Sequence, residues 1–316
     1  MLRYLLRRLG LLILTLLLTS LLIFIITQLL PGDVARVILG REAGEQELQT
    51  LRSELGLNDP APVRYLRWLS DYATGDWGLS YSTKSEIRPL VMERLRNSLM
   101  LAALAALFAI PLAIGLGVIA GLNELRWPDH VISIGSLVLV GLPEFVTGLA
   151  LIQLFAFRWK ILPANSSISP GASFSETLPM LVLPALTATL VLLAYFVRMA
   201  RAGVIEELKK PYVRTADLKG LPRRTVILKH ILRNALLPTI TVIAASIGWL
   251  IGGLIVIENV YNYPGLGRLL VFAIDRRDLP LIQAIAMIVV ITFALANLGA
   301  DLLYAVLNPR IRLIED

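Results

Sequence analysis

The sequence contains no cysteine and only two histidines among its 316 residues. Without cysteine, neither a disulfide framework nor a thiolate metal site can form. His130 and His230 stand alone at the ends of expected helices, and neither has a third ligand in reach. The chain also lacks the G-x-x-x-x-G-K-[ST] phosphate loop, the H-E-x-x-H zinc motif and the G-x-S-x-G nucleophile elbow. We therefore predict a chain that is not an enzyme, with no catalytic residues, no metal site and no cofactor of its own.

Charged residues are scarce, at 17% against about 25% in an ordinary soluble domain. Hydrophobic residues reach 56%, the mean hydropathy is +0.72, and the apolar residues form long uncharged runs. A run of about 20 residues crosses the hydrocarbon core of a bilayer as a helix, whereas a lone strand would leave its backbone groups unpaired. We predict an all-α polytopic membrane protein with six transmembrane helices. The expected spans are Leu9–Leu30, Asn97–Gly121, Val131–Phe157, Leu178–Val197, Ala235–Ile257 and Leu281–Val306.

The distribution of basic residues predicts the orientation of these spans. Arg3, Arg7 and Arg8 precede the first span, and residues 198–233 contain ten lysines and arginines. Cytoplasmic loops are enriched in such residues. We therefore place both termini in the cytoplasm. The first run is too long for a secretory signal and ends in Pro31-Gly32-Asp33, so we expect it to be retained.

Four regions follow from this topology. Residues 1–30 form the cytoplasmic N-terminus and first helix, and residues 31–96 a long external segment. Residues 97–307 form a core of five helices with a cytoplasmic loop at 200–234, and 308–316 a cytoplasmic tail. The external segment is rich in aromatic residues, which form either a belt at the lipid headgroups or a surface for a soluble partner. These residues are Tyr65, Trp68, Tyr72, Trp77 and Tyr81.

Ionisable residues are costly inside a bilayer and mark functional positions there. Apart from Asp301, which lies near a helix end, Glu144 after Pro143 is the exception within the expected spans. It either lines a cavity or contacts substrate, or it is a carboxyl beside a wet pore or one held neutral by desolvation. Glu258 lies near a helix end. Small residues at Gly117/Gly121 and at Gly248/Gly252 allow close helix packing. Packing within the bundle is the simpler interpretation for the first pair, whereas a place beside the pore or at a subunit interface is equally open for the second.

The cytoplasmic loop carries a helix signal of its own. Pro211 favours a helix start, and Gly220 favours its end. A second helix is expected at Thr225–Asn234, leading to Leu237-Pro238. Two short helices joined by a Gly-x-Pro bend would form a mechanical handle. A basic loop that satisfies only the charge rule is the other interpretation.

These residues resemble a known family. Arg214-Thr215-Ala216, Gly220 and Leu237-Pro238 are similar to the E-A-A…G…L-P loop of binding-protein-dependent ABC importers, although Arg and Thr replace Glu and Ala and the spacing is longer. From end to end the chain resembles the first permease of dipeptide, oligopeptide and nickel importers. Further matching stretches are Arg7-Arg8-Leu9, Gly75-Asp76-Trp77-Gly78-Leu79-Ser80, Leu162-Pro163, Tyr263-Pro264-Gly265-Leu266-Gly267, Arg277-Asp278 and Asn308-Pro309-Arg310.

The resemblance implies the type I ABC importer permease fold in a bacterial inner membrane. It implies a second, homologous permease as the other half of the pathway, two ATPase subunits that bind ATP and Mg, and a solute-binding protein outside; no nucleic acid is expected. The implied ATPase-coupling residues are Tyr212, Arg214, Thr215, Ala216, Asp217 and Gly220. The candidates for the pathway or its gate are Pro143, Glu144, Gly248, Gly252, Glu258, Pro264, Gly265 and Gly267.

The substrate is left open by the sequence. Di- and oligopeptides are the first expectation, because peptide carriers are the largest part of this subfamily. Nickel, glutathione, haem and short oligosaccharides are alternatives, since selectivity in this family resides mainly in the binding protein. A secondary carrier or a channel, which needs no ATPase, is the alternative from a different class.

Overall fold

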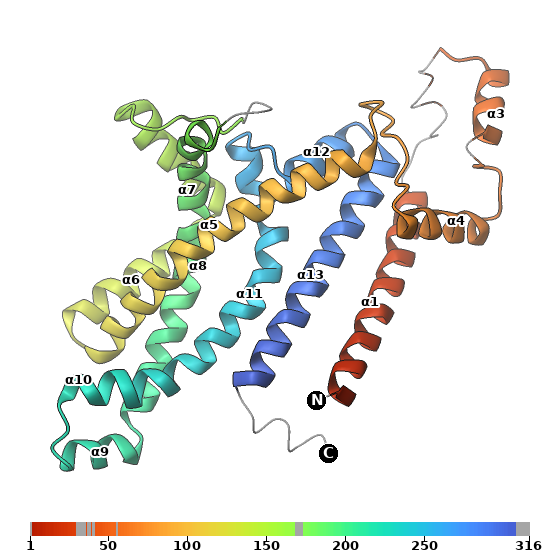
Figure 1. The fold of residues 1–316 in the computed structure, drawn as a ribbon. Coiled ribbons are helices and arrows are strands. Elements are labelled where there is room, and N and C mark those ends of the chain that lie inside the picture. Colours follow the sequence, from red (N-terminus) through yellow and green to blue (C-terminus); the bar gives the residue numbers. More distant parts are fainter. Residues whose placement is uncertain are drawn as a thin grey trace. The chain divides into compact units, whose positions relative to one another are not determined.

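A computed structural model describes residues 2–29, 36, 39, 42–54, 56–167 and 173–307. Within these ranges the chain is helical, and its sole strand-like feature is an isolated bridge between Leu79 and Glu86. The all-α prediction is confirmed. Figure 1 shows the long helices and the short ones that connect them. Pro31-Gly32-Asp33 and the tail at 308–316 lie outside the described residues.

The chain divides into two compact units, and the long helices α5 and α13 contribute to both. The first unit consists of residues 1–98 and 264–294. Its core is apolar and includes the fully buried Ile87, Val91, Leu281 and Ile285. The elements of this unit are α1 (Leu2–Leu29), α3 (Glu45–Glu54), α4 (Ala61–Thr74), the start of α5 (Ile87–Leu122), α12 (Leu266–Asp275) and the first half of α13 (Leu279–Leu307).

Aromatic rings of the segment predicted to be external, residues 31–96, pack against one another in the first unit. Tyr65 and Trp68 on α4 both contact Phe24 of α1, with ring centroids 5.5 and 6.1 Å away. Tyr72 stacks on Trp77 at 4.7 Å, and the Trp77 indole N–H donates to the Tyr72 carbonyl at 3.1 Å. Part of each ring is thus covered by its neighbours, an internal packing role that neither of the two sequence interpretations included.

The second unit consists of residues 99–263 and 295–316 and is centred on α8, along which α6, α7 and α11 all pack. Close approaches occur at glycines: a Cβ on Gly117 would lie 2.5 Å from the Cβ of Ala200, and one on Gly203 would lie 2.2 Å from the carbonyl oxygen of Ala235. The remaining elements are α6 (Trp127–Gly141), α7 (Glu144–Leu151), the π-helical η1 (Ile152–Arg158), α8 (Phe174–Leu208), α9 (Pro211–Leu218), α10 (Arg223–Thr225), the π-helical η2 (Val226–Ile231) and α11 (Leu232–Val260).

The expected third span, Val131–Phe157, is wrong as a single helix. It is broken into α6 and α7–η1, which are bent by 105°. Leu142 is extended at φ −87° and ψ 128°, because a residue before proline is pushed out of the helical region. Pro143 then caps the start of α7. The described residues thus contain five helices long and apolar enough to cross a membrane, or six if the bent pair counts as one span.

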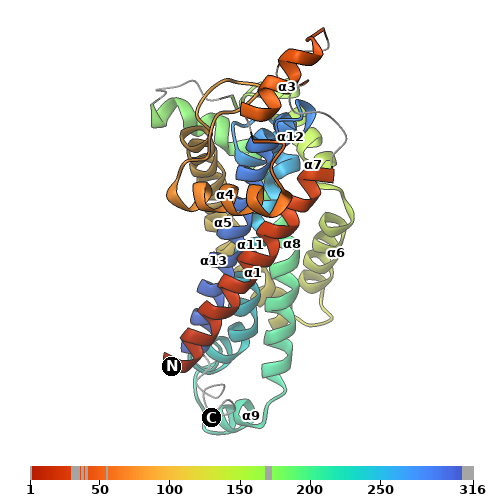
Figure 2. The ribbon, with the colours of Figure 1, turned by 90° about the vertical axis from the view of Figure 1, so that its right-hand side faces the viewer.

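The boundaries of three other spans also require correction. The second span starts ten residues early, at Ile87 instead of Asn97. The fourth continues past Val197 to Leu208, and the helix expected at Thr225–Asn234 is not separate but runs through α10 and η2 into α11. The connection between the fourth and fifth spans is therefore short, and α9 lies within it at one end of α8 (Figures 1 and 2).

Candidate functional site

Helix α9 has one face turned into the protein. Pro211 is its first residue, where the missing N–H is no loss. Val213 and Ala216 are both buried. They are three positions apart, so their side chains lie on the same face of the helix. They belong to an apolar cluster with residues of α8, η2 and α11, namely Val204, Val226, Ile231 and Ala235.

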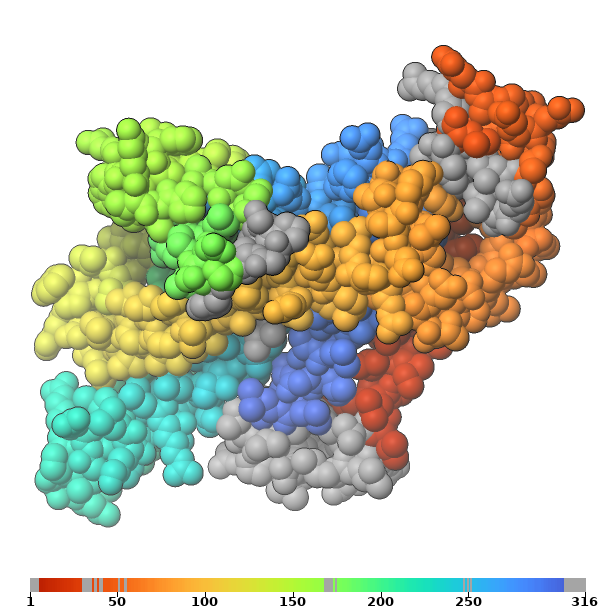
Figure 3. Space-filling view, turned by 45° about the horizontal axis from the view of Figure 1, so that its top comes forward, coloured from red at the N-terminus to blue at the C-terminus, as the bar shows by residue number. Residues whose placement is uncertain are grey.

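The other face of α9 is open to solvent. Arg214, Thr215, Asp217 and Leu218 are all exposed, and Leu218 is 81% exposed. A single exposed leucine is normal at a protein surface, so its interest here rests on its place in the helix that the sequence predicts to contact an ATPase. In the space-filling view the teal atoms of this region form one continuous surface (Figure 3). Of the six predicted coupling residues, Ala216 alone is buried, and it faces the chain's own cluster.

The start of α9 is held by hydrogen bonds, and its end is set by a glycine. The Tyr212 hydroxyl donates to the Glu207 carboxylate at the end of α8 and lies 3.3 Å from the His230 carbonyl oxygen and 3.4 Å from Asn234 Nδ2. Burial raises the pKa of Tyr212, and the Glu207 hydrogen bond raises it further, so the phenol stays protonated. Gly220 ends the turn at φ +71°, a left-handed conformation that favours glycine. The predicted bend is therefore present.

The pathway candidates are divided between the two units. Pro143 and Glu144 form the break before α7, where Glu144 is half-buried. Gly248 is buried, whereas Gly252 faces open space, with no heavy atom within 4 Å of a built Cβ. Glu258 is fully buried, and its backbone carbonyl accepts the Tyr263 N–H at 2.8 Å.

The other three candidates lie at the start of α12, in the first unit. Pro264, Gly265 and Gly267 are buried. The Asn97 side chain donates to the Pro264 carbonyl at 2.9 Å, and the Leu266 N–H donates to the Ser98 hydroxyl at 2.8 Å. These contacts attach the start of α12 to α5.

A buried carboxylate holds residues 80–82, which belong to the segment predicted to be external. Asp278 is fully buried and accepts hydrogen bonds from the Ser80 hydroxyl at 2.6 Å and from the N–H and hydroxyl of Ser82 at 2.9 and 2.6 Å. Burial raises the pKa of Asp278, but these hydrogen bonds outweigh that effect and hold the pKa below its usual range. We call this group the Asp278 clamp. It joins two of the stretches in which the sequence resembles the importer permeases, residues 75–80 and 277–278.

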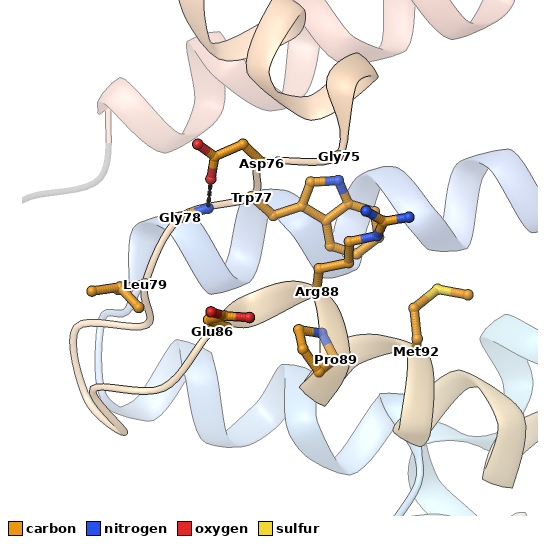
Figure 4. Close-up of a pocket in the computed structure, with 9 residues that line it drawn as sticks. All are labelled: Gly75, Asp76, Trp77, Gly78, Leu79, Glu86, Arg88, Pro89 and Met92. Atoms are coloured by element: carbon orange, nitrogen blue, oxygen red, sulfur yellow. Dashed lines mark hydrogen bonds between the residues drawn. The ribbon is translucent and has the colours of Figure 1, made fainter.

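A cavity of about 550 Å³ lies beside the clamp. Figure 4 shows its lining, in which the Asp76 carboxylate accepts the Gly78 N–H at 3.1 Å. The site mixes an indole, a guanidinium, two carboxylates and apolar groups, and it is built entirely from residues 75–92. The lining residues are Gly75, Asp76, Trp77, Gly78, Leu79, Glu86, Arg88, Pro89 and Met92.

Sequence reasoning missed several residues that the fold brings together. Leu218 was not singled out, although an apolar residue between charges in a predicted loop helix is a usable signal. Asp129 and Arg201 pair across 72 residues, and Tyr261 hydrogen-bonds Thr187 and the Gly148 carbonyl in the interior. The ends of two predicted spans carried the opposite charges of Asp129 and Arg201, but nothing local pointed to Tyr261.

Comparisons with known proteins agree with this architecture. Residues 113–313 match the family described as binding-protein-dependent transport system inner membrane component, and residues 1–102 match its N-terminal domain. The chain is 37% identical over 312 residues to the glutathione transport system permease protein GsiC of Escherichia coli strain K12, covering 99% of both chains. The protein of the same name from Salmonella paratyphi A shows the same identity and coverage.

A solved structure shares the fold. The crystal structure of an amino acid ABC transporter with histidines superposes with a TM-score of 0.54 over 68% of this chain and 93% of that one, at 16% identity. The family matches favour an importer subunit over an ATP-independent carrier or channel. The chain therefore belongs to the binding-protein-dependent transport system inner membrane components and is a multi-pass permease subunit of an ABC importer in the bacterial inner membrane.

Proposed function

We propose that this subunit forms half of the translocation pathway of an ATP-driven importer of short peptides, with glutathione, a tripeptide, first among them. The carrying observation is the full-length similarity to the glutathione permeases, together with a two-faced α9 poised to contact an ATPase. Longer peptides, nickel and other small solutes are the alternatives, to be separated by measurement.

In this proposal α9 is the coupling helix. Its buried residues, Val213 and Ala216, fix its position on the chain, and its exposed residues contact the ATPase. Leu218 is the apolar anchor. Most of the exposed charged residues near it in the sequence are basic, with Asp217 as the exception, which favours an apolar pocket with an acidic rim on the partner. These basic residues are Arg214, Lys219, Arg223, Arg224 and Lys229.

The remaining partners follow the same division of labour. A second, homologous permease closes the pathway, and two ATPase subunits bind ATP and Mg. A solute-binding protein docks outside, on the segment organised by the Asp278 clamp. The cavity beside the clamp, with Trp77 and Arg88 in its lining, supports this placement because aromatic and arginine side chains are enriched where proteins bind each other.

Uptake by the reconstituted complex tests the proposal. The chain, its partner permease, the ATPases and the binding protein encoded with it are placed in proteoliposomes with ATP inside. We expect ATP-dependent accumulation of labelled glutathione, and competition by unlabelled dipeptides shows how far the selectivity extends. Accumulation of nickel but not of either peptide, or uptake without ATP, would refute the proposal.

A further inference from the structure

We infer that the ion pair between Asp129 and Arg201 is the tie through which movement of α9 reaches α6, the first arm of the broken helix α6–α7. The inference rests on the proposed coupling role of α9. Asp129 is 1% exposed and stands in the first turn of α6, and Arg201 stands near the end of α8. Both are positioning residues.

The pair has a two-point geometry that resists sliding and rotation. Arg201 Nε lies 2.5 Å from Asp129 Oδ1, and Arg201 Nη2 lies 2.8 Å from Oδ2. The Ser133 hydroxyl donates to Oδ1 at 3.0 Å, and the Leu125 N–H donates to Oδ2 at 2.9 Å. A planar guanidinium that meets a carboxylate through two parallel bonds fixes the relative orientation of its elements, which a single contact does not.

Arg201 lies in the part of α8 against which α5 and α11 pack most closely. Built Cβ atoms on Gly117 and Gly121 of α5 would lie 3.1 Å from the backbone N and O of Arg201, and Gly203 lies against Ala235 of α11. Arg201 stands seven positions before Leu208, the last residue of α8, and α9 starts at Pro211. A displacement of α9 would therefore move a part of α8 that packs against α5, α6 and α11.

On α6, Asp129 is a buried polar anchor at the start of a largely apolar helix. Val131, Ile134, Leu137 and Val138 are exposed, as expected of side chains that face lipid. The second arm of the broken helix is held separately, because the Tyr261 hydroxyl donates to the Gly148 carbonyl of α7 at 3.0 Å and lies 2.8 Å from Thr187 Oγ1 of α8. Both arms are thus attached to α8, so a shift of α8 moves the break at Leu142–Pro143 with it.

The first test separates coupling from folding. In the complete reconstituted importer we compare Arg201→Lys, which keeps the charge but not the two-point geometry, with the double variant Asp129→Asn/Arg201→Gln, which leaves no unpaired charge. We expect ATP hydrolysis to persist while solute moved per ATP falls by about ten-fold. The control is Glu124→Gln/Lys209→Gln, an exposed pair 3.5 Å apart that joins the adjacent turn to α8; it should change nothing.

Two outcomes overturn the inference. Unchanged solute per ATP in both variants means that the tie carries no motion. Hydrolysis and uptake that fall in equal proportion, with less assembled complex, mean that the pair serves folding alone. Absence of ATP-dependent uptake in the unaltered complex refutes the proposed function instead.

A distance measurement tests the tie without any solute. Because the chain has no cysteine, Val131→Cys and Lys219→Cys place two spin labels uniquely, on α6 and just after α9. We expect the distance distribution between the labels to stay the same with and without ATP in the unaltered background and to broaden in Arg201→Lys. A distribution that Arg201→Lys leaves unchanged contradicts the inference.

Discussion

Among single residues, Asp278 shows how one carboxylate holds a segment distant in sequence. Its oxygens accept bonds from Ser80 and Ser82, and its own position before α13 lets it cap that helix, with the Leu281 N–H 3.4 Å from Oδ1. A fully buried acceptor with several donors cannot be removed without leaving those donors unsatisfied. The conformation of residues 78–85 therefore depends on this side chain.

We predict that Asp278→Ala lowers the free energy of unfolding by about 2–4 kcal/mol, because a hydrogen bond to a charged group contributes about 1.5–3 kcal/mol. Thermal unfolding in detergent measures the effect. Asp76→Asn is the control, since the Asp76 carboxylate is exposed and accepts the Gly78 N–H of its own loop. Equal effects from the two substitutions would show that the clamp does not stabilise the fold.

The same carboxylate predicts a pH dependence. The pKa of Asp278 is lower in the folded protein than in the unfolded chain, so its stabilisation is fully present above the unfolded value of about 3.9. It is lost as the pH falls from there through the folded value. The stability difference between the unaltered protein and Asp278→Asn should therefore shrink below about pH 4. A constant difference across this range would contradict the lowered pKa.

Among helices, the contact between α5 and α8 depends on glycine at particular positions. A Cβ at Gly117 would lie 2.7 Å from the Val197 carbonyl oxygen, which cannot move without shifting α8, whereas a Cβ at Gly115 meets nothing within 4 Å. The bundle-packing interpretation of Gly117/Gly121 agrees with these contacts. The open space at Gly252 leaves it available for a neighbour outside this chain.

We predict that a glycine-to-alanine substitution has different effects on the free energy of unfolding at two positions of α5. Gly117→Ala should destabilise the protein by about 1–3 kcal/mol through overpacking. Gly115→Ala should be neutral or stabilise it by up to about 1 kcal/mol, because alanine favours the helix. Unfolding in detergent compares them, and a Gly117→Ala protein as stable as Gly115→Ala would show that the contact can relax.

For α9, Leu218→Ala should weaken binding of the ATPase by about ten-fold, since buried apolar anchors contribute most to such interfaces. Co-purification and titration of the ATPase onto the permease pair measure this. The matched control is Leu228→Ala, on η2, where the side chain is also exposed. If both variants bind equally well, Leu218 is not the anchor.

At the scale of the whole molecule, the distribution of basic residues predicts the orientation in the membrane, with both termini and α9 in the cytoplasm. Asp76→Cys and Lys219→Cys give two single-cysteine proteins, both at exposed positions. An impermeant maleimide should label position 76 in intact spheroplasts and position 219 only after lysis. The reverse pattern would invert the topology and exclude α9 as a cytoplasmic contact.

Much of this architecture was predictable because its signals are local. Uncharged run length indicated the spans, Pro211 the start of α9, and Gly220 its end. The span boundaries were less predictable, because they depend on packing that composition does not reveal. α8 continues past Val197 because Ala200 is buried against α5, and Val204 in the apolar cluster that includes Val213 and Ala216 of α9. The break at Pro143 was visible as a proline, but its 105° bend was not.

The sequence by itself determined that this chain crosses a membrane repeatedly, has no phosphate loop and carries a short helix between two spans. Only the tertiary structure decided which face of α9 is exposed, and that Ala216 points inward while Leu218 points out. It also paired Asp129 with Arg201, and Ser80 with Asp278 across 198 residues. Helix propensity and periodicity act over a few turns, whereas such pairs depend on how distant helices pack.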